Sequence, residues 1–94
     1  MDVKEAVKKA MEQFIDIFQS EPMENVALEE VVFNSEENVW EVTIGFSRPW
    51  DNPNDKSLIS DLHRGRQVRN YKVVVIDDQS GVIKSIKIRS FRNA

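Results

Sequence analysis

The sequence predicts an α+β domain in which an N-terminal helix packs on a four-stranded antiparallel meander sheet, in two layers. Three patterns support this: a helical apolar period at the start of the chain, strict alternation in residues 39–46, and two further strand-like segments joined by a turn after residue 70. A helix and a sheet that each carry one apolar face can bury both against each other. Because 94 residues are enough for one core and too few for two, we expect a single domain over residues 1–94.

The helix is expected over residues 3–19. Apolar residues recur there every three or four positions, which is the period of an amphipathic helix. They are Val3, Val7, Met11, Phe14 and Phe18. Asp2 followed by Glu5 is typical of an N-terminal capping box, and Pro22 keeps the residue before it out of the helical region. These signals predict a helix that begins almost at the first residue and ends near Gln19.

The first two strands are expected over residues 26–34 and 39–46, with the acidic turn S-E-E-N of residues 35–38 between them. The second strand alternates cleanly, as a half-buried antiparallel strand does. Its inward positions are Trp40, Val42, Ile44 and Phe46. We therefore expect Trp40 in the core, and Glu29 and Glu30 on opposite faces of the preceding strand.

The third strand is expected to begin between Val68 and Tyr71. A turn over residues 77–81 joins it to the fourth strand, and Gly81 supplies the left-handed backbone conformation of that turn. In the final strand, alternation places Ile86 and Ile88 toward the core, with Ile83 and Phe91 on the polar side. Residues 73–76 are apolar on both faces, which predicts a central strand whose outer face is covered by the long loop or by a second subunit.

Composition excludes several classes of function. The chain has no cysteine, so it has no disulfide or thiolate site, and no segment approaches the ~18 apolar residues of a membrane span. Its charged N-terminus does not resemble a signal peptide, and we expect a cytoplasmic protein that contacts no membrane. His63 is the only histidine and the acidic pairs fall in exposed strands or turns. We therefore expect no enzyme activity, no catalytic residues, no metal site and no cofactor.

Charge is distributed unevenly along the chain. Residues 1–47 hold 3 lysines and 11 acidic residues, for a net charge of −8, whereas residues 48–94 hold 10 basic and 5 acidic residues, for +5. One interpretation is that the two halves pair their charges across neighbouring strands. The other is a two-faced surface whose basic side meets an acidic partner or a phosphate backbone.

Residues 71–83, with the sequence Y-K-V-V-V-I-D-D-Q-S-G-V-I, resemble the strand, turn and strand signature of PepSY-type domains. The order of one helix and then four strands is similar to the cystatin-like superfold and to some small bacterial proteins. The resemblance implies a sheet that wraps a helix, with roles in inhibition, docking or ligand binding. Cystatin-type inhibitors carry Q-x-V-x-G in a hairpin; residues 67–70, Q-V-R-N, lack that spacing and glycine, so protease inhibition is not carried over.

The long connection of residues 47–69 is the main candidate for function, because loops of this length in compact domains are usually functional or disordered. Proline at 49 and 53 stiffens its first half, and residues 55–65 are expected to form a short helix. The candidate binding residues are Trp50 and the arginines at the two ends of the loop, Arg48, Arg64, Arg66 and Arg69.

Three interpretations of Trp50 remain open from the sequence. It can fold back over a sheet edge or over the outer face of Val74 and Ile76, anchor a protein partner, or stack on a nucleic acid base while arginines hold phosphates. A pI of about 5.1 argues against nucleic acid as the main partner. We therefore predict a small non-enzymatic interaction module that docks a protein partner through residues 47–69. The alternative is a ligand-binding or catalytic fold with a pocket between helix and sheet, and a homodimer is compatible with either.

Overall fold

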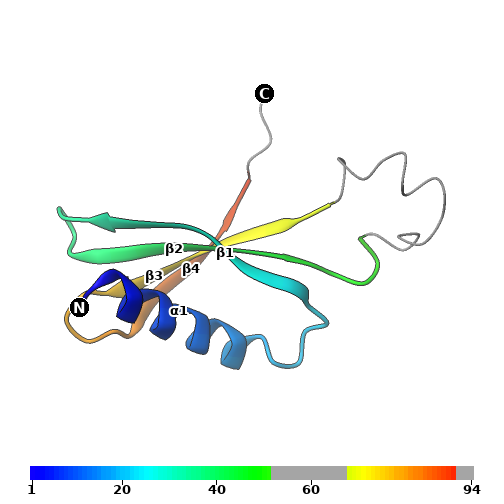
Figure 1. Ribbon diagram of the computed structural model, residues 1–94, viewed down its shortest axis with the longest axis horizontal. Helices are drawn as coiled ribbons and strands as arrows, with labels where there is room; N and C mark the ends of the chain where they lie inside the picture. Colours follow the sequence, from blue (N-terminus) through cyan, green and yellow to red (C-terminus); the bar gives the residue numbers. More distant parts are fainter. Residues whose placement is uncertain (52–67, 91–94) are drawn as a thin grey trace.

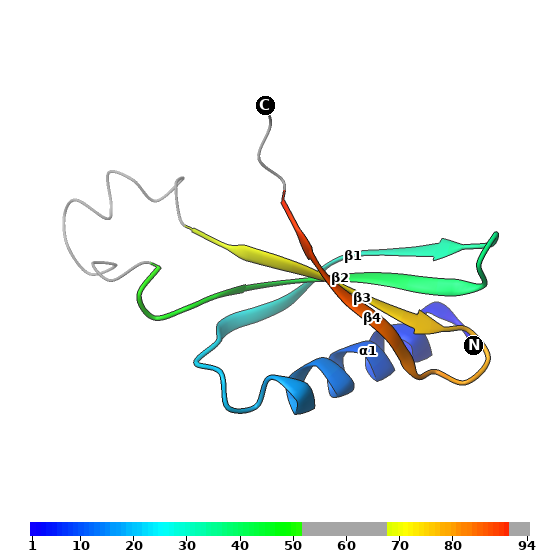
Figure 2. The same ribbon diagram turned by 180° about the vertical axis from the view of Figure 1, so that it is seen from behind.

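The computed structural model describes residues 1–51 and 68–90, which form one helix and four strands (Figure 1). The elements are α1 (Val3–Ile17), β1 (Glu24–Asn34), β2 (Val39–Ser47), β3 (Asn70–Asp77) and β4 (Ile83–Arg89). The strands lie in the order β1-β2-β3-β4, and each pairs antiparallel with the next. Seen from both sides, α1 lies along one face of a strongly twisted sheet (Figure 2). The predicted helix on a four-stranded meander is confirmed.

Helix α1 begins as the capping signal predicts and ends slightly early. The Asp2 carboxylate accepts a hydrogen bond from the Glu5 backbone N–H at 2.8 Å, which satisfies one of the free donors of the first turn. The helix ends at Ile17, two residues before the predicted end. Phe18 leaves the helical conformation there and its ring packs on Phe14, with centroids 4.8 Å apart.

Both hairpin turns lie where the sequence predicts them. In residues 35–38, the Asn34 side chain accepts the backbone N–H groups of Glu36 and Glu37, at 3.0 and 3.2 Å. In the turn after β3, the Asp77 carboxylate accepts the N–H groups of residues 79 and 80, and Gly81 has a φ of 72°. In these turns, side-chain oxygens accept backbone N–H groups that have no partner in a neighbouring strand. Because donor and acceptor are only a few residues apart, such turns can be predicted from the sequence.

The core lies between α1 and the face of the sheet that the alternation of β2 predicts. Its fully buried members are Ala6, Ala10, Phe14, Val42, Ile44, Phe46, Val74 and Ile76. The two alanines let the helix backbone approach the strands closely. Trp40 is half-buried against this core, and its indole N–H donates to the Asp78 carboxylate at 2.8 Å. The prediction that Trp40 belongs to the core is therefore confirmed in part, because Trp40 packs at the edge of the core.

The prediction of which β4 side chains face the core is wrong at both ends of the strand. Val75 pairs with Ser85 but Ile76 pairs with Ile83, so Lys84 is an extra residue in a bulge. A bulge reverses the alternation, and Ile83 therefore packs against the core rather than on the polar side. Ile88 lies on the side of β4 that the alternation predicts, but it is 84% exposed at the outer edge of the sheet. Phe91 lies outside the described residues.

A side chain that the sequence analysis did not single out ties α1 to the second hairpin. The Gln13 amide donates to the backbone carbonyl of Gly81 at 2.8 Å and accepts the backbone N–H of Ile83 at 3.3 Å. Gln13 therefore fixes the position of the turn relative to the helix.

Candidate functional site

The described start of the loop, residues 48–51, is a turn held to the sheet by one carboxylate. One oxygen of Asp51 accepts the backbone N–H of Arg48 at 2.9 Å and the side-chain amide of Asn70 at 2.7 Å. The Asp51 N–H in turn donates to the Arg48 carbonyl at 3.0 Å. Because Asn70 is the first residue of β3, this carboxylate connects the end of β2 to the start of β3.

Trp50 projects from this turn and is 62% exposed. It does not cover Val74 and Ile76, which lie on the face under α1 and are fully buried there. The interpretation that Trp50 folds back over these residues is therefore wrong. A large apolar ring that also carries an N–H donor is a side chain enriched at interfaces, so the exposed Trp50 is a candidate contact residue.

Arg48 contacts the end of the core instead of standing free. Its guanidinium lies 5.1 Å from the centroid of the Phe46 ring, a cation–π distance. Phe46 packs on Phe14 at 6.0 Å, and Lys72 lies 5.4 Å from the ring of Phe18. Two cations thus cover an aromatic cluster at the end of the molecule where Trp50 lies, and Arg48 has a structural contact in addition to its predicted role.

Arg69 is paired with a glutamate on the face of the sheet opposite α1. Its guanidinium lies 3.0 Å from the Glu29 carboxylate, and the pair sits over Gly45 of β2. A Cβ on Gly45 would lie 2.9 Å from the Arg69 nitrogen and closer still to the Glu29 carboxylate. Gly45 is therefore the residue that makes room for this ion pair. A glycine inside a strand was the sequence signal that could have revealed it.

The expectation that Glu29 and Glu30 lie on opposite faces is wrong. Leu28 pairs with Ile44 and Glu30 with Thr43, so Glu29 is the extra residue of a β-bulge. The bulge turns both carboxylates to the open face of the sheet, which we define as the face opposite α1. Both glutamates are engaged there in ion pairs with arginines.

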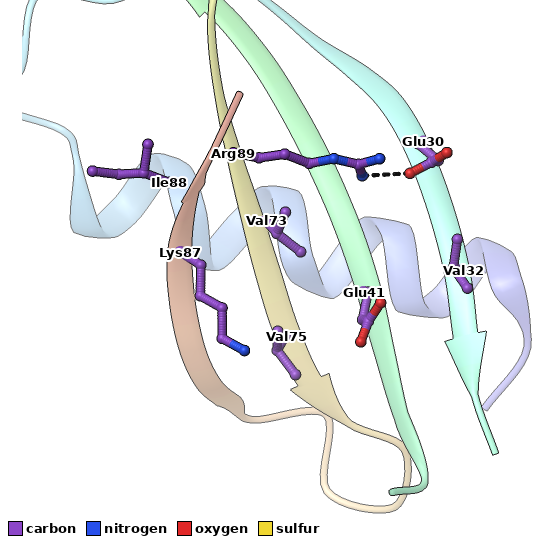
Figure 3. Close-up of a pocket in the computed structure, with 8 residues that line it drawn as sticks. All are labelled: Glu30, Val32, Glu41, Val73, Val75, Lys87, Ile88 and Arg89. Carbon is purple, nitrogen blue, oxygen red and sulfur yellow. Dashed lines mark hydrogen bonds and ion pairs between the residues drawn. The ribbon is translucent and has the colours of Figure 1, made fainter. Parts of the chain in front are cut away.

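Arg89 crosses the open face from β4 to β1. Its guanidinium pairs with Glu30 and donates to the Thr43 hydroxyl at 2.8 Å, and Figure 3 shows the side chain extended over β3 and β2. Thr43 is 1% exposed beneath it. Charges from the two halves of the chain do pair, as one interpretation predicted, but across intervening strands rather than between neighbours.

Beside these pairs the open face carries a shallow hollow of about 410 Å³. Its apolar floor is formed by Val32, Val73 and Val75, and Val75 is only 9% exposed. The apolar outer face predicted for β3 is thus present, and long charged side chains from the adjacent strands surround it. A second hollow, of about 360 Å³, lies between α1 and β1 and is lined by Val3, Lys4, Val7, Lys8, Leu28 and Val31.

Several predicted features lie outside the described residues, namely Arg64, Arg66, His63 and the expected short helix of residues 55–65. Within residues 1–51 and 68–90, no three histidine, cysteine, aspartate or glutamate side chains are grouped closely enough to hold a metal ion. No helix in the same ranges is long and apolar enough to cross a bilayer.

Of the five predicted binding residues, three are described, and they lie at one end of the sheet with different surroundings. Trp50 is exposed, Arg48 covers Phe46, and Arg69 pairs with Glu29. The residues that hold them, Asp51 and Gly45 among them, were missed because their roles depend on partners distant in sequence. Comparison with models of protein families, with curated proteins and with solved structures gives no match, so the argument on function rests on these contacts.

Proposed function

We propose that this chain is a non-enzymatic interaction module that docks on a protein partner through residues 47–69, with Trp50 as the anchor. The observation that carries the proposal is the exposed indole of Trp50 on a turn held by Asp51. Tryptophan is enriched among the residues that dominate binding energy. A side chain on a fixed turn also loses less conformational entropy on binding than one on a free segment.

The arginines have separate roles in this proposal. The sequence suggests Arg48, Arg64 and Arg66 as charges that orient the partner, and in this proposal Arg64 and Arg66 keep that role. Arg48 and Arg69 hold the base of the loop, because each already contacts a group of its own chain. The matching surface on the partner is an apolar pocket for the indole with acidic residues at its rim.

The test compares retention of proteins from a lysate of the source organism, treated with nuclease, by wild-type protein and by single variants. Trp50→Ala removes the anchor, Asp51→Ala releases the turn but keeps the indole, and Ile17→Ala is the control, since Ile17 is a 53% exposed apolar residue on α1. For a partner captured by the wild type, we expect Trp50→Ala to raise Kd by at least about thirtyfold, the loss typical of a hot spot.

We expect Asp51→Ala to raise Kd by a smaller factor, because the turn must then be ordered on binding. Ile17→Ala should leave Kd unchanged. Adding Arg66→Glu to Trp50→Ala should abolish retention. A partner that binds the double variant as well as the wild type would show that the loop is not the docking site, and retention that disappears with nuclease would indicate nucleic acid instead.

The relation of this fold to the cystatin-like superfold and to PepSY-type domains is also a proposal. It is supported by the order of one helix and a four-stranded meander, and by the strand, turn and strand of residues 71–83. It implies docking or ligand binding as the type of function, which agrees with an exposed anchor on the loop after β2.

The hollow between α1 and β1 supports ligand binding as a second candidate. Its walls are apolar and Lys4 and Lys8 are among its lining residues, a combination that suits a medium-chain carboxylate. The test is a titration with octanoate, followed by the methyl NMR signals of Leu28 and Val31. Saturable shifts confined to the hollow, lost in Lys8→Glu, would support this candidate, and unchanged spectra would exclude it.

A further inference from the structure

The open face of the sheet carries two kinds of charged side chain. Near the start of β3, Glu29 pairs with Arg69, and beside it Glu30 pairs with Arg89. These two pairs are neutral units that bridge distant strands. Two further charged side chains that line the hollow on this face take no part in these pairs.

Those remaining charges are Glu41 on β2 and Lys87 on β4. Both line the hollow, and they lie on either side of Val73 and Val75, which belong to β3 between them (Figure 3). Within the described part of the chain, neither Glu41 nor Lys87 has an ion-pair partner. The surface is therefore an apolar strip with one acidic and one basic flank.

We propose that the open face binds a second copy of this chain, face to face, with β3 packed on β3. A two-fold axis that runs along β3 in the plane of the interface carries the β4 side of one copy over the β2 side of the other. Glu41 of each copy then faces Lys87 of its partner, twice per dimer, and the valines of the two strips meet between them. Such an interface is self-complementary, as a closed dimer requires.

The charge layout favours this axis over one that runs across the strands. A two-fold axis running across the strands would place β4 on β4 and bring the two Lys87 side chains together, with the two Glu41 side chains also opposed. Like charges in contact are unfavourable, whereas the axis along β3 gives two attractive pairs. The self-complementary layout is what favours a second copy over an unrelated partner.

The size of the face sets the strength of the dimer. The axis along β3 overlaps three strands of each copy, β2, β3 and β4, which are about 4.8 Å apart and about seven residues long and give a contact of roughly 14 Å by 23 Å. Stable interfaces bury about 800 Å² on each partner, and this flat area is less than half of that. We therefore expect a weak dimer, with a Kd on the order of 100 µM, that weakens further as salt is added.

The experiment is sedimentation equilibrium of the full chain over a concentration range from about 10 µM to about 1 mM, which brackets the expected Kd. The variants are Glu41→Lys, Lys87→Glu and the two changes combined in one chain. Controls with the same charge change elsewhere are Glu36→Lys in the β1–β2 turn and Lys84→Glu in the β4 bulge, both exposed and outside the hollow. Circular dichroism checks that each variant is folded.

We expect the wild type and both controls to approach twice the monomer mass of 10.9 kDa as concentration rises. Each single variant should raise Kd at least tenfold, because it places like charges together twice. An equimolar mixture of Glu41→Lys and Lys87→Glu should form a heterodimer with the wild-type Kd, and so should the double variant with itself.

A wild-type chain that stays monomeric over the whole range would overturn the proposal. A dimer that Glu41→Lys and Lys87→Glu weaken no more than the controls do would place the interface on another surface, and would also overturn it. A mixture of the single variants that does not associate would rule out the two-fold axis along β3.

Discussion

On the face under α1, the side chains of Val42, Ile44 and Val74 are fully buried by the helix, whereas on the open face the same strands present valines beside ion pairs that span the sheet. One set of strands supplies both faces because alternate residues point in opposite directions. The face under α1 excludes water by apolar packing. The open face is covered in part by the extended side chain of Arg89, which lies over β3 and β2 (Figure 3).

This difference shows how a small domain with one helix can limit the exposure of a second apolar face. A long arginine side chain contributes an aliphatic segment that covers apolar atoms and a charged group that reaches a carboxylate two or three strands away. Such cover is less complete than helix packing and is sensitive to salt. The two faces should therefore respond differently to substitution, and the predictions below test that.

The largest effect is expected under the helix. Phe14→Ala removes a fully buried ring that contacts Phe18 and Phe46, and it should lower the free energy of unfolding by about 3–5 kcal/mol. Val73→Ala on the open face removes fewer atoms from a half-buried site and should cost less than half of that. Urea unfolding measures both values. If Phe14→Ala does not fold, Ile44→Val is the substitute, with an expected loss of about 0.5–1.5 kcal/mol.

Equal losses at Phe14 and Val73 would contradict the comparison, because they would mean that the open face is as well packed as the face under α1. The opposite result, no measurable loss at Val73, would indicate that the valines of the open face serve an interface rather than the fold. Measuring Val73→Ala at low and high protein concentration separates these contributions.

An intermediate effect is expected at Gly45, where the open face is most crowded. Gly45→Ala places a methyl group against the Glu29 carboxylate and the Arg69 guanidinium. Both are the ends of flexible side chains, so we expect a loss of only about 1 kcal/mol from the displacement of the ion pair. The loss should shrink when Glu29→Ala is added, since the clash is then removed. A double-mutant cycle by urea unfolding measures this coupling. Additive losses would show that the ion pair is not what requires glycine.

The elements themselves could be predicted because their signals are local. The spacing from Val3 to Phe18 indicates the helix, the alternation from Trp40 to Phe46 indicates β2, and Gly81 marks the second turn. Each of these patterns depends on residues a few positions apart, and the structure confirms each element to within a few residues. The exposure of Trp50 remained open, because the sequence does not show which apolar surface is already covered.

The side-chain faces could not be predicted where a bulge intervenes. One extra residue at Glu29 and one at Lys84 reverse the alternation, and neither bulge has a local sequence signature. The same limit applies to pairs such as Arg89 with Glu30, which are 59 positions apart. Gly45 was the one useful signal, because a glycine inside a strand often marks the close approach of another group.

The smallest effect is expected at Asp77, a partly exposed carboxylate at the end of β3. Hydrogen bonds from the backbone and then the hydroxyl of Ser80 lower the pKa of Asp77 below its ordinary value. A carboxylate with a lowered pKa in the folded state adds stability above its unfolded pKa, and that stability is lost as pH falls through the folded pKa, below about pH 4. Asp77→Asn should therefore lower stability slightly near neutral pH, leave it unchanged at low pH, and so flatten the acid side of the stability curve. NMR titration of the Asp77 carboxyl carbon and of the Ser80 amide measures this directly, and a midpoint at or above that of an unstructured aspartate would contradict it. Because Asp77 is only partly buried and lies in a turn, a large acid transition that depended on it would mean that the turn, and not the core under α1, controls unfolding.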